Sequence, residues 1–160
     1  MKPILSSISV LSILGCGYSL RPPVLIPYKS VASPIVSNST VKAGLEDILL
    51  EELISCIKTE SNLKIVPEKD AELIIECNIT NYTRTPQTYT ANQDVLTYQI
   101  LITATVTIKD RTAEDGTAIF TGELSGLTSY DIIEKTEDDG IRQAARKLSQ
   151  NILKKITISW

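Results

Sequence analysis

The residue with the clearest chemical signature in this sequence is Cys16. It follows Ile13, Leu14 and Gly15, so a thiol stands directly after a small residue and an apolar run. This order is typical of a precursor that is acylated on the cysteine and then cut in front of it. Each CH₂ group that an acyl chain buries adds about 0.8 kcal/mol to membrane binding. We therefore expect a lipid anchor at Cys16; the alternative is an ordinary secretory signal in which the cysteine is incidental.

The segment before Cys16 has the composition of an export signal. Lys2 supplies a positive charge, and residues 4–14 form an apolar run that only serines interrupt. A transmembrane helix needs roughly 20 apolar residues, so this run is too short to span a bilayer. We interpret residues 1–15 as a signal peptide of an exported lipoprotein.

The other residues offer little for catalysis or metal binding. The sequence has no histidine, the commonest general base and metal ligand, and its three cysteines are too scattered for a zinc cluster. Ser125 lies one place too late for a Gly-x-Ser-x-Gly turn, and residues 137–140 lack the spaced oxygen ligands of a calcium loop. A net charge of −3 without a basic run does not suit nucleic acid. We expect a protein that is not an enzyme, holds no metal or cofactor and binds no nucleic acid.

Two of the cysteines are placed where they could meet. Cys56 falls on the apolar stripe of a predicted helix, and Cys77 on the apolar face of a strand that this helix should cover. An exported protein meets oxidising conditions, which permit a disulfide. Side-chain direction does not fix the distance between the Cα atoms, so both a Cys56–Cys77 disulfide and two buried thiols remain open.

One folded domain follows a tether. Residues 16–28 contain three prolines, which disfavour helix and sheet, and residues 29–160 carry the periodic patterns of a domain. The first extended segment, residues 29–40, contains Pro34. Proline donates no ladder hydrogen bond, so this strand is expected at an edge or with a bulge.

The rest of the domain alternates between helical and extended patterns. Thr40 is expected to cap a helix that runs to about residue 60. After a short extended stretch, a strand is expected over residues 71–85. The clearest strand is 96–109, with apolar side chains on one face and mainly threonine and glutamine on the other, which indicates a sheet covered on one face only. An Asp-Gly turn leads to a strand over 118–130.

The final element is a helix whose start is marked by Thr136 and Asp139. The order strand, helix, three strands, helix predicts an α+β fold: a two-layer sandwich of two helices packed on one face of a four-stranded mixed, mostly antiparallel sheet. The first connection should be a parallel crossover, and the rest should be hairpins. The predicted core contains Leu53, Ile57, Ile75, Ile100, Ile102, Leu148 and Ile152.

Six segments in a fixed order connect this chain to a known family. They are GCGYSLR, SPIVSNST, ITNYTRTP, LTYQILITATVTIKDR, DGTAIFTGE and TSYD, which together run through most of the sequence. Each motif is loose by itself, and the order and spacing carry the match. By these segments the chain resembles the LptE lipopolysaccharide-assembly lipoproteins.

The resemblance implies a non-catalytic role at the outer membrane. LptE-like proteins plug the lumen of the large LptD β-barrel, help it to assemble, and contact lipopolysaccharide on its way to the outer leaflet. The residue that follows the cysteine is Gly17 and not an aspartate. By resemblance to Gram-negative lipoproteins, we therefore expect outer-membrane sorting with a lipid anchor on the periplasmic face. The polar sheet face would suit a barrel wall. The alternative is a free envelope lipoprotein that binds another periplasmic protein or ligand.

A ligand that carries phosphates and carboxylates requires cations at accessible ends of the sheet. Lys135 matches a position where LptE-like proteins often keep a basic residue. Arg84 and Arg111 are the other candidates for binding lipopolysaccharide. Each of the three could instead be a solubilising surface charge.

Overall fold

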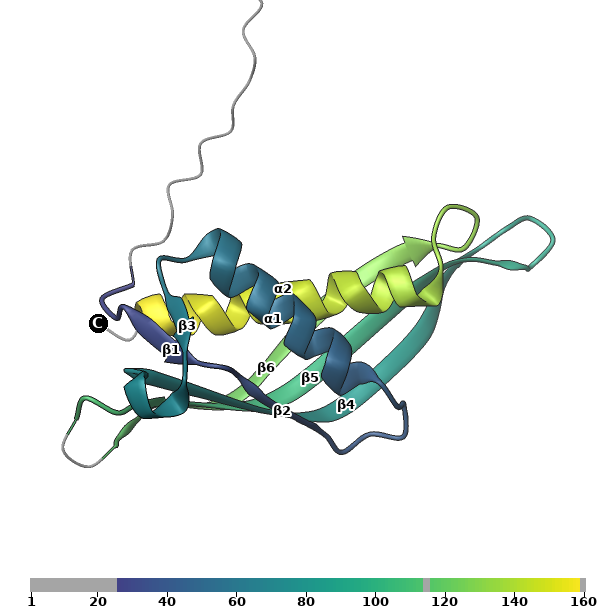
Figure 1. Cartoon of the computed structure of the whole chain (residues 1–160). Helices are drawn as coiled ribbons and strands as arrows, with labels where there is room; N and C mark the ends of the chain where they lie inside the picture. The colour runs from purple at the N-terminus through teal and green to yellow at the C-terminus, as the bar shows by residue number, and fades with distance from the viewer. Residues whose placement is uncertain (1–25, 114–115, 159–160) are drawn as a thin grey trace, which may run out of the picture.

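The computed structural model describes residues 26–113 and 116–158. Two helices lie on one face of a six-stranded sheet (Figure 1). The strands have the order β3-β1-β4-β5-β6, and β2 pairs with β4. The elements are β1 (Ser30–Ala32), β2 (Ile35–Asn38), α1 (Leu45–Glu60), β3 (Lys64–Val66), the 3₁₀ turn η1 (Glu68–Asp70), β4 (Leu73–Tyr89), β5 (Val95–Asp110), β6 (Ala118–Asp131) and α2 (Glu137–Ile158). The α+β sandwich is confirmed, and the predicted count of four strands is wrong.

The two additional strands have separate causes. Pro34 divides the predicted first strand into β1 and β2, because proline cannot donate to a ladder. β3 forms from the short extended stretch after α1 and pairs in parallel with β1. Both β1 and β2 run parallel to β4, which confirms the crossover through α1. The β4–β5 and β5–β6 pairs are antiparallel, as expected of hairpins.

The two helices begin differently from one another. α1 starts at Leu45, so the prediction that Thr40 caps it is wrong: the N-cap is Gly44, whose φ of 82° suits a residue without a side chain. α2 starts as predicted. The Thr136 hydroxyl accepts a hydrogen bond from the Asp139 amide at 3.2 Å, and the Asp139 carboxylate accepts one from the Thr136 amide at 2.9 Å. This reciprocal pair is a capping box.

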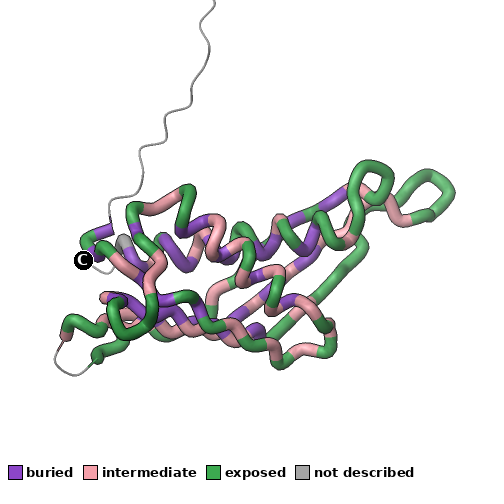
Figure 2. Tube along the Cα trace, in the orientation of Figure 1, coloured by how far each residue is buried: buried purple, intermediate pink, exposed green. Residues whose placement is uncertain are grey.

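The core lies between the helix layer and the sheet (Figure 2). Each of the seven predicted core residues is at most 1% exposed. In β5 the buried side chains alternate with half-buried ones from Ile100 to Ile108, so the sheet is covered on one face, as predicted. None of the described helices is both long and apolar enough to cross a membrane.

The position of α2 depends on a close approach to β6 at Gly126. A Cβ added to Gly126 would lie only 2.7 Å from the backbone nitrogen of Leu148 and would also press on the carbonyl group of Ala144. Only a residue without a side chain lets the helix backbone lie this near to the strand. The contact fixes α2 on the sheet and, with it, the first turn of α2.

One end of the molecule projects beyond the helix layer. The turn between β4 and β5 and the loop between β6 and α2 extend side by side there (Figure 1), and the Ile132 amide in the loop donates to the carbonyl oxygen of Leu96 in β5 at 3.2 Å. We call this part, residues 89–96 and 132–136, the projecting end. β1 and β3 lie at the opposite end of the sheet (Figure 1).

Candidate functional site

A bulge in β4 decides on which face of the sheet Arg84 lies. The register with β5 shifts between Ile79 and Asn81, so Thr80 is the extra residue. Without this shift, strict alternation would place Arg84 on the open face together with Asn78. With it, Arg84 lies opposite Ile100, on the face that the helices cover. Sequence reasoning missed this change of face because the alternation gave no sign of an extra residue.

The guanidinium of Arg84 is held between aromatic rings and a carboxylate. Its Cζ lies 3.5 Å from the centre of the Tyr98 ring and 5.8 Å from that of Tyr130. Its Nε donates a hydrogen bond to the Tyr130 hydroxyl at 2.8 Å and lies 3.4 Å from a carboxylate oxygen of Glu137. Stacking on a ring and hydrogen bonding in its plane are the two contacts for which a guanidinium is suited.

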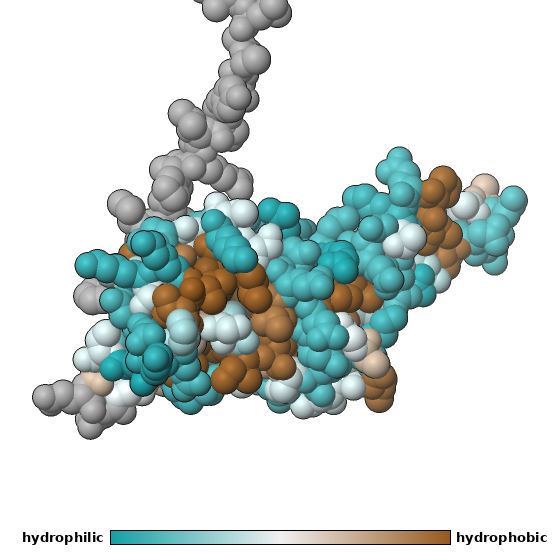
Figure 3. Space-filling model, in the orientation of Figure 1, coloured by the Kyte–Doolittle hydropathy of each residue, from teal (hydrophilic) through white to brown (hydrophobic). Residues whose placement is uncertain are grey.

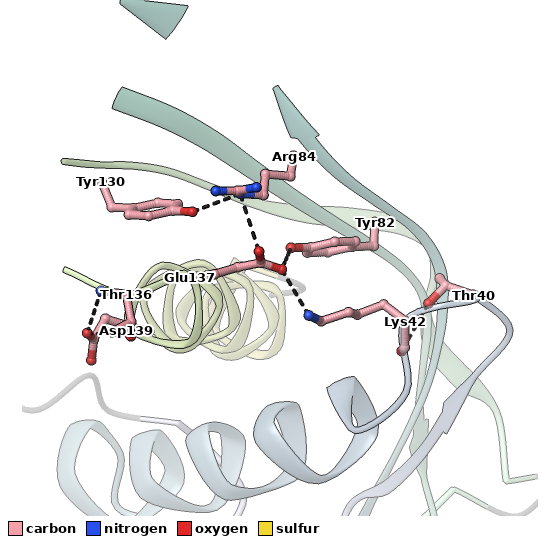
Figure 4. Close-up of polar contacts among 8 residues, drawn as sticks. All are labelled: Thr40, Lys42, Tyr82, Arg84, Tyr130, Thr136, Glu137 and Asp139. Carbon is pink, nitrogen blue, oxygen red and sulfur yellow. Dashed lines mark hydrogen bonds and ion pairs between the residues drawn. The ribbon is translucent and has the colours of Figure 1, made fainter. Parts of the chain in front are cut away.

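Glu137, in the first turn of α2, is the centre of these contacts (Figure 4). Its Oε1 accepts hydrogen bonds from Lys42 Nζ at 2.9 Å and from the Tyr82 hydroxyl at 3.0 Å, while Oε2 faces Arg84. One carboxylate therefore contacts two cations and a hydroxyl group. We call these residues the Glu137 cluster: Lys42, Tyr82, Arg84, Tyr130 and Glu137.

The loop before α1 brings Lys42 to the cluster. The Asn38 side-chain amide donates hydrogen bonds to the Lys42 carbonyl oxygen and to the Glu46 carboxylate, both at 2.8 Å, and its oxygen accepts from the Thr40 amide at 2.9 Å. Asn is well suited to such turns because its side chain bonds the backbone two residues on. This network, with Gly44, replaces the cap expected at Thr40. Lys42 was not among the predicted site residues, and only the turn-forming Asn38 could have drawn attention to it.

The charges in the cluster reinforce one another. The hydrogen bond from Lys42 is the largest of the influences that lower the pKa of Glu137, and Tyr82 and Arg84 act in the same direction. Burial followed by the hydrogen bond to Glu137 raises the pKa of Tyr82. Burial opposes the charged form of Arg84, but the contacts with Tyr130 and Glu137 outweigh it and raise its pKa. These contacts therefore favour the ionised carboxylate of Glu137 and the charged guanidinium of Arg84.

The three predicted cations do not form one site. Lys135 is exposed in the loop at the projecting end, two residues before Glu137, so it lies at the same end of the molecule as Arg84. Arg111 follows β5 at the opposite end, where its amide donates to the Glu72 carbonyl oxygen and its guanidinium to that of Glu68. Cys16 and the tether up to residue 25 lie outside the described residues.

Cys56 and Cys77 are both buried as free thiols, which is one of the two outcomes that the sequence left open. Burial raises the pKa of Cys56 to about 11 and that of Cys77 to about 12, so neither ionises readily at neutral pH. Among the described residues, no group of three or more histidine, cysteine, aspartate or glutamate side chains is arranged to hold a metal ion.

The uncovered face of the sheet is dominated by hydroxyl and amide groups. We call it the open face, and the cross-strand register places on it Asn78, Asn81, Thr83 and Thr85 of β4, Thr97, Gln99, Thr103, Thr105 and Thr107 of β5, and Thr121, Ser125 and Ser129 of β6. The apolar pair Leu101 and Leu127 and the acidic Glu123 lie on the same face. Glu76 pairs there with Lys109 at 2.7 Å. A shallow hollow of about 320 Å³ lies between β2, β4 and β5, and Ile35, Ser37, Thr105 and Thr107 are among its lining residues.

The projecting end combines charge with apolar surface. Ile132 and Ile133 are 46% and 80% exposed, and Tyr89, at the end of β4, is 57% exposed. Apolar surface is visible at this end in the space-filling view (Figure 3). Lys135 lies two residues after Ile133 in the chain, with Glu134 between them. This end can therefore offer apolar contact and a cation to the same ligand.

Comparison with known proteins places the chain in a family. The family model LptE, described as lipopolysaccharide-assembly, matches residues 28–156, which is nearly the whole described domain. No curated protein matches the sequence.

Several solved structures share the fold at low identity. The hypothetical protein CT253 from Chlamydia trachomatis has a TM-score of 0.59 and 14% identity over 81% of this chain and 96% of that one. A PelC dodecamer from Paraburkholderia phytofirmans gives 0.51 and 12% over 85% and 91%, and an uncharacterized lipoprotein B from Nitrosomonas europaea gives 0.50 and 16% over 88% and 90%. At these identities the structures support the fold alone.

Proposed function

The chain belongs to the LptE lipopolysaccharide-assembly family, and from this premise we propose that it is a lipid-anchored outer-membrane protein that plugs an LptD-like β-barrel. In this role it is non-catalytic. It helps the barrel to assemble and contacts lipopolysaccharide during transport to the outer leaflet. The proposal places Cys16 in the membrane as an acylated N-terminus and the domain within the barrel.

The observation that carries the proposal is the open face. Its threonine, serine, asparagine and glutamine side chains cover the same side of three long strands. The inner wall of a large barrel is polar, and a polar interface of this kind is held by hydrogen bonds and bridging water more than by apolar burial. Among the charged side chains of this face, Glu76 and Lys109 pair with each other, whereas Glu123, opposite Thr105, would need a partner on the barrel wall. These properties fit the open face to a barrel wall.

The projecting end fits the ligand. Lipopolysaccharide is an amphiphile with phosphates next to acyl chains, and Lys135 lies two residues after the exposed Ile132 and Ile133 pair, beyond Glu134. A lysine can supply a point charge to a phosphate, and the isoleucines can lie against an acyl chain. Arg84 is at the same end but is engaged by Glu137. Arg111 is at the other end of the sheet, so we leave it out of the proposed ligand site.

Copurification from detergent tests the contact with the barrel. Thr105→Arg places a long cation in the middle of the open face, whereas Thr59→Arg makes the same substitution on the exposed side of α1. We expect Thr59→Arg and the wild type to bring down a stoichiometric barrel protein and Thr105→Arg to bring down much less. If the wild type never recovers a barrel, the plug is wrong and the free envelope lipoprotein becomes the better reading. If both variants recover the barrel equally, the open face is not the contact.

A pair of charge reversals tests the ligand contact. Lys135→Asp should weaken binding of lipopolysaccharide by the purified protein and make the remaining binding less sensitive to salt, since fewer phosphate contacts are left to be screened. Arg111→Asp changes the net charge equally at the opposite end of the sheet and should leave binding nearly unchanged. Equal losses in the two variants would show that binding depends only on the net charge of the protein. That result would contradict a site at Lys135.

A further inference from the structure

We infer that Glu137 is an internal competitor for the ligand: its carboxylate occupies the cations Lys42 and Arg84, and a phosphate group of a bound lipid takes its place. This inference rests on the proposed function, because it concerns the anionic ligand of that same end of the molecule. It adds Lys42 and Arg84 to the proposed ligand site at Lys135. In this view Glu137 decides whether these two cations are free to bind a phosphate.

The geometry shows a place prepared for an anion with more than one oxygen. Lys42 Nζ and the Tyr82 hydroxyl converge on one oxygen of Glu137, at 2.9 and 3.0 Å, and Arg84 faces the other at 3.4 Å. The donors come from the loop before α1 and from β4, and the carboxylate that they meet comes from α2, far from both in the sequence (Figure 4). Two cations around one carboxylate leave an excess of positive charge for a dianionic phosphate to neutralise.

The cations stay in place without Glu137. Arg84 is stacked on Tyr98 at 3.5 Å and bonded to Tyr130, so neither of these contacts depends on the carboxylate. Asn38 holds the backbone at Lys42 through the Lys42 carbonyl oxygen. Loss of the carboxylate therefore removes a competitor, leaves the guanidinium of Arg84 preorganised and keeps the backbone of Lys42 in place, which favours ligand binding.

The carboxylate can be exchanged for a phosphate because the cluster is open to solvent. The side chains of Lys42, Arg84 and Glu137 are 38%, 33% and 32% exposed. Ion pairs at this exposure contribute little to stability, so breaking them opposes ligand binding only weakly. Within the described residues, both polar contacts of Arg84 go through Nε, and a phosphate could approach the two terminal amino groups. A phosphate would gain charge-assisted hydrogen bonds with both cations.

A neutral isostere of Glu137 tests the inference directly. The probe is hexa-acylated lipid A bisphosphate in dodecyl maltoside micelles, measured by titration calorimetry at low salt with full-length mature protein. Glu137→Gln keeps the size of the side chain and removes its charge, and should bind the probe about fivefold more tightly, as expected for removal of one charge a few ångströms from a phosphate. In Glu137→Gln/Arg84→Gln, which removes one of the released cations, most of this gain should be lost.

Asp138→Asn is the matched control. Asp138 is the next residue of α2 and carries the same charge, but no ion pair joins it to Lys42 or Arg84 in the part of the chain that the structure describes. We expect its affinity to stay within about twofold of the wild type, because Asp138 pairs with neither Lys42 nor Arg84 and its removal therefore frees no cation. A gain equal to that of Glu137→Gln would show a general electrostatic effect and overturn the inference.

A measurement on the wild type avoids any dependence on how the variants fold. The ¹³C resonance of the Glu137 carboxyl group should shift as lipid A is added, because Lys42 and Tyr82 leave it. A resonance that does not move at saturation overturns the inference even if affinities change.

The outcomes separate this inference from the proposed function. If the wild type binds the probe, Lys135→Asp weakens binding and Glu137→Gln equals the wild type, the ligand site stands and the competitor does not. If neither the wild type nor Glu137→Gln binds the probe, the ligand role is wrong and the inference falls with it. The copurification of the barrel, which depends on the open face, then decides separately whether the plug survives.

Discussion

Gly126 is the position at which a single methyl group should do the most damage to the sheet–helix interface. In Gly126→Ala the new Cβ would stand 2.7 Å from the Leu148 nitrogen, where ordinary contacts begin at 3.4 Å, and it would also meet the carbonyl group of Ala144. Both obstacles are helix backbone, which cannot rotate away as a side chain can. α2 would therefore have to move away from β6 by about 0.7 Å or more and lose packing along its buried stripe.

The magnitude follows from two opposing effects. Overpacking of a well-packed interface costs about 1–3 kcal/mol, and backbone obstacles place Gly126→Ala near the upper limit. Alanine also restricts the unfolded chain more than glycine does, which returns about 0.5–1 kcal/mol. We expect a net loss of about 2 kcal/mol in the free energy of unfolding, which lowers the midpoint of thermal unfolding by roughly 5–10 °C.

The assay is thermal unfolding followed by circular dichroism, with urea unfolding to obtain the free energy. Gly122→Ala is the control in the same strand, because its nearest neighbour at 3.2 Å is the tip of the Phe120 ring, which can shift. That variant should unfold within about 0.5 kcal/mol of the wild type. Identical curves for Gly126→Ala and the wild type would refute the close approach of α2 to β6. The position of Glu137, which the first turn of α2 carries, would then be wrong as well.

Four further expectations are open to simple measurements. Leu148→Ala should lose about 2–5 kcal/mol of unfolding free energy in urea, because it leaves a cavity between α2 and the sheet; an unchanged value would refute the predicted packing. Cys56 and Cys77, with pKa values raised by burial to about 11 and about 12, should resist alkylation at about pH 8 until the protein unfolds, and prompt modification of the native protein seen by mass spectrometry would contradict their burial. The contacts of Glu137 lower its pKa below 4.5, so the stability that its charge provides is present above that pH and is lost as the pH falls through the lower pKa of the folded state. The advantage of the wild type over Glu137→Gln in the free energy of urea unfolding should therefore shrink between about pH 6 and pH 3. A constant advantage would refute this reasoning. Cys16→Ser should yield no acylated N-terminus by mass spectrometry, and an unaltered mature form would rule out lipidation there.

The layers of the fold could be predicted because they follow from alternation. Between residues 96 and 109 every second side chain is apolar, and the face that these residues form is the one that the helices cover. The capping pair of Thr136 and Asp139 marked the start of α2 correctly, because both partners lie within four residues of one another. Local chemistry of this kind leaves a direct trace in sequence.

The parts that could not be predicted depend on contacts between distant segments. β3 is only three residues long and becomes a strand because β1 lies beside it. The bulge at Thr80 shows itself only in the register with β5, yet it moves Arg84 to the covered face. Lys42 and Glu137 are 95 residues apart, and neither has a pattern around it that points to the other. The ion pairs of the candidate site were therefore outside the reach of periodicity and motif spacing.

The contact with a barrel can be tested in living cells by photo-crosslinking. A photoreactive amino acid in place of Thr105 lies in the middle of the open face, and the same amino acid in place of Thr59 lies on the helix layer. We predict that the Thr105 position forms a crosslink to a large outer-membrane β-barrel protein and that the Thr59 position forms far less. A strong crosslink to the barrel from Thr59 with none from Thr105 would show that the open face does not meet the barrel wall, and the absence of any barrel crosslink from either position would contradict the plug itself.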